Sequence, residues 1–286
     1  MKNLADVRVV KQILADSGFK FSKSLGQNFL IDENVLDKMI ENGGINKTVN
    51  VLEIGPGFGT LTQKLCINAK KVVSVEIDST VIPILAKNTE EFDNLKIINA
   101  DVMKTDLKKL LNEEFGDESV KVVANLPYYI TTPIIMMLLE NELKVDDIII
   151  MIQKEVADRI SAKPCTKDYG ALTVAVNFYS VAEVIVNVPP SAFIPQPKVS
   201  SSVIRLAVRS EPPVNVKNKK NYFKVVKASF GQRRKTLLNA LSNSGITNKP
   251  KDELSALLEG VDISGQRRGE TLTLEEFAIV ADTIFE

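Results

Sequence analysis

The sequence contains no histidine among its 286 residues. This absence excludes catalytic triads with a histidine base, and it excludes metal sites built on imidazole. Only two cysteines occur, Cys66 and Cys165, which are too few and too far apart for a disulfide framework or a zinc site. Any catalysis must therefore rest on amides, carboxylates, tyrosine or the positioning of substrates, and no metal is expected.

Long apolar runs are also missing, since no stretch approaches the ~20 residues of a membrane span. The first twenty residues mix acidic and basic side chains and lack the apolar core of a signal peptide. With 44% hydrophobic and 25% charged residues, the composition is typical of a globular protein in solution. We therefore expect a cytoplasmic protein with no membrane partner.

The most informative stretch is a short apolar run followed at once by three alternating glycines. Residues 49–59 read V-N-V-L-E-I-G-P-G-F-G, which predicts a buried strand and then a turn at Gly55, Gly57 and Gly59. The spacing differs from the G-x-G-x-x-G dinucleotide fingerprint, and Glu53 precedes the turn. An acidic residue there suits a ligand with an ammonium group and no phosphates, which points to S-adenosylmethionine. A tight turn without a ligand is the alternative at this stage.

Short β-branched runs recur along the chain and alternate with helical patterns. The five predicted strands are residues 49–54, 71–77, 95–99, 120–124 and 147–152. This alternation predicts an α/β fold with a doubly wound, Rossmann-like parallel sheet. Residues 183–188 and 202–208 are predicted to add an antiparallel pair at its edge, and the prolines of residues 189–199 predict an ordered loop without regular structure.

Acidic residues follow the second and third predicted strands, at the edge where open α/β sheets bind ligands. Glu76 lies about 20 residues beyond Gly55, the distance at which a carboxylate reaches ribose hydroxyls. Asp78 is the competing candidate for that role. Asp101 follows the third strand, and a purely structural role as an N-cap is equally compatible with its position.

Asn125-Leu126-Pro127-Tyr128 follows the fourth strand and carries the clearest chemical signal. An exocyclic adenine amine is a poor nucleophile, so its methylation requires acceptors for its two protons. Asn125 Oδ1 and the Leu126 carbonyl are suitable acceptors, Pro127 fixes the backbone, and Tyr128 offers a ring on which a base can stack. Phe193 is a candidate for the other face of the base. The alternatives are a turn with Tyr128 in the core, and a Phe193 that only fills the core.

After residue 213 the pattern becomes helical, which predicts a small all-helical C-terminal domain. The predicted ranges are an N-terminal helix and arm at 1–30, a methyltransferase domain at 31–210 and an RNA-binding domain at 211–286. Residues 217–235 hold eight cations and no acidic residue, so this run is a candidate phosphate-binding face. For its last four residues, 232–235, the alternative to RNA contact is a solvated helix start. The RNA-binding candidates are Lys20, Lys23, Lys220, Lys224, Lys227, Arg233, Arg234 and Lys235.

Five motifs together resemble the bacterial 16S ribosomal RNA adenine dimethyltransferase family, also called KsgA or RsmA. They are K-S-L-G-Q-N-F-L, V-L-E-I-G-P-G-F-G-T-L-T, N-L-P-Y-Y-I, F-I-P-Q-P-K-V-x-S and F-G-Q-R-R-K-T-L. The resemblance implies an S-adenosylmethionine-dependent enzyme that dimethylates N6 of two adjacent adenosines in a hairpin loop near the 3′ end of 16S RNA. The implied partner is that RNA within the assembling 30S subunit, and we expect a monomer.

The resemblance also implies roles for individual residues. Glu76 would hold the ribose of the cofactor, Asp101 its adenine amine, and residues 27–30 would close the pocket. The expected cofactor-binding residues are Gln27, Asn28, Leu30, Glu53, Gly55, Gly57, Glu76, Ile77, Asp101, Val102 and Asn125.

Two rival functions are compatible with the same fold. One is the related enzyme group that methylates an adenine of 23S RNA and confers macrolide resistance; G-Q-R-R-K, F-I-P-Q-P-K-V and the longer helical domain argue against it. The other is a non-catalytic ribosome-assembly factor, which would be indicated by loss of Asn125, Tyr128 or the glycines. None of these residues is lost.

Overall fold

The computed structural model describes residues 3–19, 21–22 and 25–286, and the chain divides into two compact units. The first unit comprises residues up to 157 together with 181–208, and the second comprises 158–180 with 209–286. Within the described residues, none of the helices has the length and apolar character that a membrane span requires.

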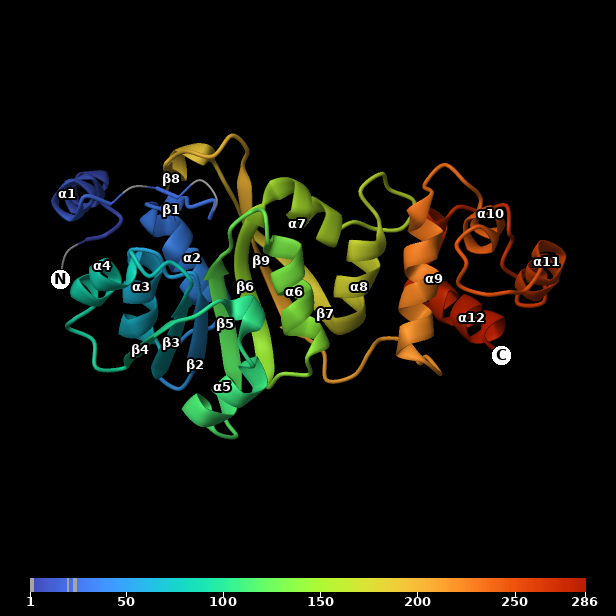
Figure 1. The fold of residues 1–286 in the computed structure, drawn as a ribbon, viewed down its shortest axis with the longest axis horizontal. Helices are drawn as coiled ribbons and strands as arrows, with labels where there is room; N and C mark the ends of the chain where they lie inside the picture. The colour runs from blue at the N-terminus through green and yellow to red at the C-terminus, as the bar shows by residue number, and fades with distance from the viewer. Residues whose placement is uncertain (1–2, 20, 23–24) are drawn as a thin grey trace. The chain divides into compact units, whose positions relative to one another are not determined.

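A seven-stranded sheet forms the first unit (Figure 1), in the order β4-β3-β2-β5-β6-β9-β7. The strands are β2 (Asn50–Ile54), β3 (Lys71–Glu76), β4 (Leu95–Asn99), β5 (Val120–Asn125), β6 (Val145–Gln153), β7 (Ser180–Val188) and β9 (Ser201–Val208). Strands β2 to β6 are parallel, and β9 runs antiparallel to β6. The predicted α/β fold, with its parallel sheet and added edge strands, is confirmed.

Strands β2, β3, β5 and β6 are buried on both faces because helices cover them, whereas the edge strand β4 is only partly covered. The helices of this unit are α1 (Val7–Ser17), α2 (Glu33–Asn42), α3 (Thr60–Asn68), α4 (Ile82–Asn88), α5 (Leu107–Phe115) and α6 (Thr131–Glu140). Leu36 of α2 and Leu65 of α3 pack with Val51, Val72 and Val123 in one buried cluster on one face of the sheet. The strand ends that carry the site are thus held by a continuous core.

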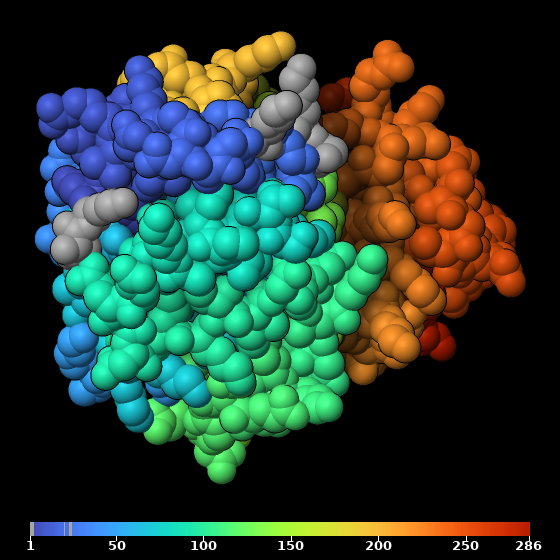
Figure 2. Space-filling view, turned by 60° about the vertical axis from the view of Figure 1, so that its left-hand side comes forward, coloured from blue at the N-terminus to red at the C-terminus, as the bar shows by residue number. Residues whose placement is uncertain are grey.

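Four phenylalanines attach the N-terminal segment to the glycine turn. Phe19, Phe21, Phe29 and Phe58 form a chain of ring contacts with centroids 4.0–6.2 Å apart. Val10 and Val81 belong to the same cluster, and Figure 2 shows the blue N-terminal residues lying against the cyan segment that includes α4. Aromatic packing, rather than helix propensity alone, therefore holds this segment in place.

The proline-rich segment 189–199 is more regular than predicted. Pro190–Ala192 forms a 3₁₀ turn, and β8 (Phe193–Ile194) pairs antiparallel with β1 (Phe29–Leu30). Because none of these paired positions is a proline, the short ladder forms despite the prolines on either side.

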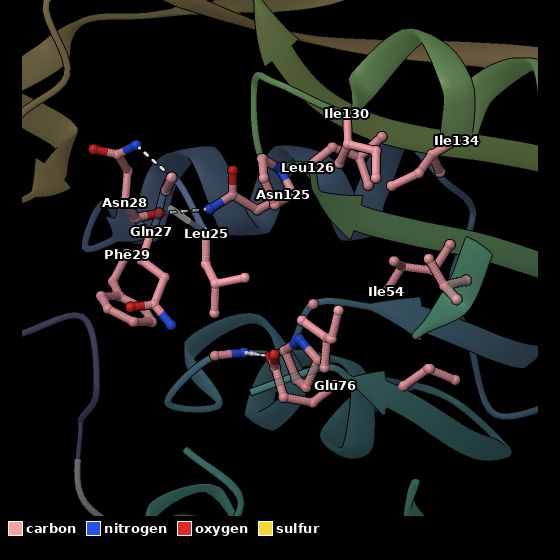
Figure 3. Close-up of a pocket in the computed structure, with 18 of the residues that line it drawn as sticks. Leu25, Gln27, Asn28, Phe29, Ile54, Glu76, Asn125, Leu126, Ile130 and Ile134 are labelled. Carbon is pink, nitrogen blue, oxygen red and sulfur yellow. Dashed lines mark hydrogen bonds between the residues drawn. The ribbon is translucent and has the colours of Figure 1, made fainter. Parts of the chain in front are cut away.

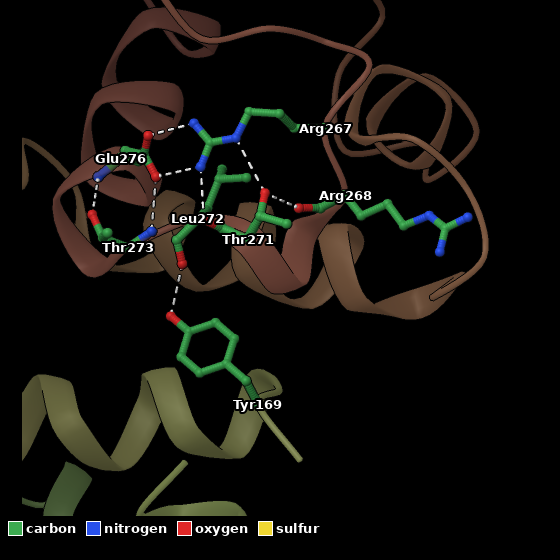
Figure 4. A network of polar contacts seen from close by, with 7 residues as sticks. All are labelled: Tyr169, Arg267, Arg268, Thr271, Leu272, Thr273 and Glu276. Atoms are coloured by element: carbon green, nitrogen blue, oxygen red, sulfur yellow. Dashed lines mark hydrogen bonds and ion pairs between the residues drawn. The ribbon is translucent and has the colours of Figure 1, made fainter. Parts of the chain in front are cut away.

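The second unit is helical, as predicted. Its helices include α8 (Ala171–Tyr179), α9 (Lys219–Gly231), α10 (Leu237–Ser242), α11 (Lys251–Glu259) and α12 (Leu274–Ile284), and α7 (Lys154–Ile160) spans the point where the chain passes between units. In Figure 4 the Arg267 guanidinium is paired with Glu276, which also completes a capping box with Thr273 at the start of α12. The Tyr169 hydroxyl donates to the Leu272 carbonyl at 2.8 Å.

Two expectations need adjustment here. Residues 158–180 belong to the helical unit, although the predicted ranges place them within 31–210; Phe178 of α8 packs on Tyr222 of α9, with ring centroids 5.0 Å apart. The helical pattern expected after residue 213 is also interrupted: α9 ends at Gly231, residues 232–235 form a turn closed by a bond from Lys235 N to Gln232 O, and α10 begins at Leu237. The functional division into domains stays a prediction.

Candidate cofactor and substrate site

A pocket opens at the carboxyl ends of β2, β3 and β5, where the glycine turn, the segment 25–30 and the Asn125 loop meet (Figure 3). This is the edge at which open α/β sheets bind ligands. Of the predicted cofactor residues, ten line it: Gln27, Asn28, Leu30, Gly55, Gly57, Glu76, Ile77, Asp101, Val102 and Asn125. Their individual roles stay predictions.

The glycine turn has the backbone conformation that its sequence requires. Gly55 and Gly57 have φ angles of 69° and 57°, a region that residues with a Cβ rarely adopt. A Cβ placed on Gly57 would lie 2.6 Å from the Phe29 ring, so an alanine there would displace that ring. Glycine therefore allows both the turn and the close packing of residue 29 on it.

Glu76 is held at the end of β3 by backbone donors. Its Oε2 accepts from Gly57 N at 3.1 Å and its Oε1 from Asp78 N at 2.9 Å. Burial raises the pKa of Glu76, and the two backbone donors oppose that rise. Its carboxylate is thereby fixed beside the pocket, and its contact with the ribose stays a prediction.

Asp101 is an N-cap, and it also lines the pocket. Its side chain accepts from Met103 N at 3.0 Å and caps a 3₁₀ turn, Val102–Lys104, while the residue also lines the pocket. Capping fixes the carboxylate direction, so the structural role and the cofactor role are compatible.

Glu53 does not reach the pocket, which corrects its assignment to the cofactor. Its exposed fraction is 0%, and Oε2 accepts from Ser74 Oγ at 2.6 Å and from Thr62 Oγ1 at 2.8 Å. Oε1 has no partner among the described residues. Because strand residues alternate in direction, Glu53 lies on the same side of β2 as Val51, facing α3, where burial raises its pKa to about 7.

Asn125 has its amide orientation fixed by a neighbouring backbone group. Asn125 Nδ2 donates to the Asn28 carbonyl at 2.9 Å, and because a carbonyl can only accept, this bond identifies the nitrogen. Figure 3 shows the amide nitrogen turned toward Asn28. Among the described residues, no donor reaches Asn125 Oδ1 or the Leu126 carbonyl. Two consecutive residues that line the pocket therefore each offer a free acceptor, Asn125 Oδ1 and the Leu126 carbonyl.

Pro127 and Tyr128 complete this loop. Ile130 N donates to the Pro127 carbonyl at 3.2 Å, which closes a turn, and Tyr128 OH lies 2.6 Å from Ser201 Oγ on β9. Tyr128 is half-buried, and burial raises the pKa of its hydroxyl. Its ring is thus anchored through the hydroxyl and lines the pocket, rather than being buried in the core.

Phe193 is a core residue, which corrects its assignment as a stacking partner. It is only 1% exposed, pairs with Leu30 through β8, and belongs to the same cluster as Val188 and Val203. The short β8 ladder turns this side chain inward, so the core-filling alternative is the right one.

In its described part, the segment 21–30 is bonded to the loop after β3 and within itself. Gln27 Nε2 donates to Asp78 Oδ2 at 2.6 Å, and Gln27 Oε1 accepts from Ser22 N at 2.9 Å. Asp78, the competing ribose candidate, therefore binds the protein's own segment. Lys20 and Lys23 lie outside the described residues, and their RNA-binding role stays a prediction.

Sequence reasoning missed several residues at the pocket. Tyr129 and Leu25 line it, and Ser201 anchors Tyr128 from 73 residues away. The Tyr-Tyr pair was visible in the sequence, but nothing in it distinguishes which ring faces inward. Long-range partners such as Ser201 have no local signal.

The cations of the basic run are exposed, but they differ in their contacts with the rest of the chain. Lys220, Lys224 and Lys227 share one exposed face of α9, opposite the buried Tyr222 and Val226. Arg233 instead donates to the Lys167 carbonyl at 2.5 Å and pairs with Glu270 at 3.4 Å, so part of its function is structural. Arg234 and Lys235 are exposed in the turn after α9.

A family model described as ribosomal RNA adenine dimethylase matches residues 18–280. The chain belongs to the ribosomal RNA adenine dimethylase family. It is therefore an rRNA adenine methyltransferase, and its cofactor is S-adenosylmethionine.

Relatives in this family match over the full length. The chain is 50% identical over 289 residues to the ribosomal RNA small subunit methyltransferase A of Bacillus licheniformis, covering 100% of this chain and 98% of that one. It is 49% identical over 284 residues to the protein of that name from Clostridioides difficile, covering 99% and 98%.

Two solved methyltransferase structures share the fold. A dimethyladenosine transferase from Plasmodium falciparum superposes with a TM-score of 0.75 at 28% identity, covering 88% of this chain and 95% of that one. The 23S rRNA methyltransferase ErmE superposes with a TM-score of 0.67 at 25% identity, covering 90% of this chain and 100% of that one.

Glu53 makes stability depend on pH in a defined direction. Below pH about 4.5 the Glu53 carboxyl is neutral in the folded and unfolded chains alike. Between about pH 4.5 and 7 it is ionised in the unfolded chain but still protonated in the folded one. The wild type should therefore lose unfolding free energy relative to Glu53→Gln as pH rises through this window, by about 3 kcal/mol in all. Urea unfolding at pH 4.5, 5.5, 6.5 and 8 measures it.

The exposed Glu41→Gln is the matched control for this series, since it makes the same chemical change on the surface of α2. Parallel pH profiles for the wild type and Glu53→Gln would contradict the account of a buried, proton-retaining Glu53.

Proposed function

We propose that this enzyme uses S-adenosylmethionine to dimethylate N6 of two adjacent adenosines in the 3′-terminal hairpin loop of 16S rRNA. The observation that carries the chemistry is the pair of free acceptors, Asn125 Oδ1 and the Leu126 carbonyl, in the pocket. The choice of RNA is supported by the names of the full-length relatives, which are small-subunit methyltransferases.

The residues of the pocket fit an adenosyl cofactor. Glu76 offers a fixed carboxylate for ribose hydroxyls, and Asp101 offers an acceptor for an exocyclic amine. Ile77 is 49% exposed although it is apolar, and with the buried Val102 it supplies an apolar surface for a purine ring. When bound, S-adenosylmethionine supplies an activated methyl group.

Asn125 and Leu126 prepare the nucleophile. The lone pair of an adenine amine is delocalised into the ring, so hydrogen bonds from its N–H groups to these acceptors draw electron density onto the nitrogen. Both N–H groups donate in the first transfer and the one that remains donates in the second; after each transfer the methylated nitrogen releases one proton to solvent. Asn28 holds the Asn125 amide so that Oδ1, not Nδ2, is available. No strong base is needed, which agrees with a chain that lacks histidine, and orientation provides much of the rate increase.

The pocket accepts a base that has left its duplex, and Tyr128 offers that base a surface for stacking. A base inside a duplex cannot reach a closed pocket, so the target must be a loop nucleotide that can be splayed out. Tyr128 lines the pocket with its hydroxyl tied to Ser201, which leaves the ring as a rigid surface for stacking.

The exposed face of α9 is the proposed contact for the RNA backbone. Lys220, Lys224 and Lys227 recur at helical spacing, and none has an acidic partner among the residues that the structure describes. Lys224 Nζ also lies 5.6 Å from the centroid of the Phe285 ring. Exposed cations without acidic partners favour phosphate binding, because they release counterions from the RNA. Arg234 and Lys235 extend the set, while Arg233 is partly occupied by Glu270.

The 23S methyltransferase alternative is less well supported. The identity to ErmE is 25%, against 50% for the small-subunit enzymes. We further propose that the protein acts as a monomer on the 16S RNA of the precursor 30S subunit, in the cytoplasm.

The proposed reaction is tested with labelled S-adenosylmethionine and three particles: unmethylated small subunits, mature small subunits and large subunits. We expect N6,N6-dimethyladenosine only from unmethylated small subunits. Asn125→Ala should lower turnover by about 10²–10³-fold, because one acceptor is lost, and this fall should far exceed any loss of cofactor affinity caused by the missing bond to Asn28. Nuclease digestion and nucleoside analysis identify the product.

Asn112→Ala makes the same substitution at an exposed position on α5 and should act like the wild type. Label in large subunits would move the assignment to 23S RNA. Normal turnover of Asn125→Ala would remove this residue from the mechanism.

The α9 face is tested by replacing Lys220, Lys224 and Lys227 with glutamine. Affinity for small-subunit RNA should fall, and the slope of log K against log salt should become shallower by about 2. Replacing the exposed Lys38, Lys108 and Lys109 instead makes an equal change of net charge in the first unit. An equal effect of both triple variants would show that α9 makes no specific contact.

A further inference from the structure

Tyr129 is the most exposed large hydrophobic residue in the described part of the chain. Its exposed fraction is 58%, yet it lines the same pocket as Asn125 and Leu126. Burying an aromatic ring is favourable, so a ring left on the rim of a pocket is available to a ligand.

Two consecutive tyrosines of this loop are held in different ways. Tyr128 OH is tied to Ser201 Oγ, whereas the Tyr129 hydroxyl has no partner among the described residues. Leu126 N donates to Met151 O at 3.1 Å, and Thr131 Oγ1 donates to Pro127 O at 3.0 Å. The backbone is therefore fixed on both sides of the pair, and Tyr129 is presented to solvent from a rigid turn.

The segment that closes the pocket also limits where the Tyr129 ring can go. A Cβ built on Gly26 would lie 3.4 Å from Tyr129 Cδ1 and 3.8 Å from its Cε1, which is ordinary contact distance. The ring edge therefore lies beside the backbone of residue 26. A ring restricted in this way loses little entropy when a flat ligand stacks on it.

We propose that Tyr129 is a second stacking surface, which binds the unpaired RNA base next to the adenosine in the pocket. This inference rests on the proposed function. A nucleotide splayed into a pocket breaks the stack with its neighbour, and an aromatic ring at the rim replaces that lost partner. For two adjacent target adenosines, the one outside the pocket is held beside it while the other reacts.

The test is a series of substitutions at Tyr129, assayed with unmethylated small subunits. Tyr129→Ala and Tyr129→Leu should raise KM for the particle about tenfold, whereas Tyr129→Phe and Tyr129→Trp should stay within about twofold of wild type. A leucine retains apolar bulk without a flat ring, so the series separates stacking from simple burial. Affinity for S-adenosylmethionine, measured by calorimetry without RNA, should be unchanged throughout.

Met103→Ala is the matched control, because Met103 is an exposed apolar residue that does not line the pocket. A KM for Tyr129→Leu equal to that of Tyr129→Phe would overturn the stacking role. Weaker cofactor binding by Tyr129→Ala, in proportion to its KM, would assign the residue to closing the pocket instead. Failure of the wild type to methylate any particle would overturn the proposed function itself, and this inference with it.

Discussion

The packing of the Phe29 ring on the glycine turn is the contact on which the pocket depends. Gly57 has a φ of 57°, and the site of its missing Cβ lies 2.6 Å from the ring. Phe29 also stacks on Phe58, with centroids 4.0 Å apart and planes 11° from parallel. A side chain at residue 57 would push the ring away, so a glycine there is what brings residues 27–30 over the strand ends.

That contact links the cofactor side of the pocket to the reacting side. From the position set by Phe29, Gln27 reaches Asp78 after β3, and the Asn28 carbonyl receives Asn125 Nδ2 after β5. The second bond orients an amide whose oxygen is then free for a substrate amine. The enzyme thus needs no titrating base at the reacting atom, because the fixed acceptors and the fixed loop orient and activate the substrate amine.

Much of this was predictable from sequence, because the glycine turn, the β-branched strands and Asn-Leu-Pro-Tyr have strong local patterns. Glu53 and Phe193 were misassigned for a common reason: type and position along the chain do not tell which way a side chain points. The burial of Glu53 depends on Ser74 and Thr62, and that of Phe193 on the two-residue pairing with β1. Residues 158–180 belong to the helical unit because α8 packs on α9, and such a tertiary contact has no local pattern in the sequence.

The most direct measurement is the affinity of Gly57→Ala for S-adenosylmethionine, compared with that of Gly116→Ala by calorimetry. Gly116 has a similar φ of 62° but nothing within 4 Å of its Cβ position, so it too places an alanine at positive φ, without the crowding. The account predicts at least about tenfold weaker binding for Gly57→Ala and unchanged binding for Gly116→Ala. Equal affinity of Gly57→Ala and the wild type would contradict the dependence of the pocket on this contact.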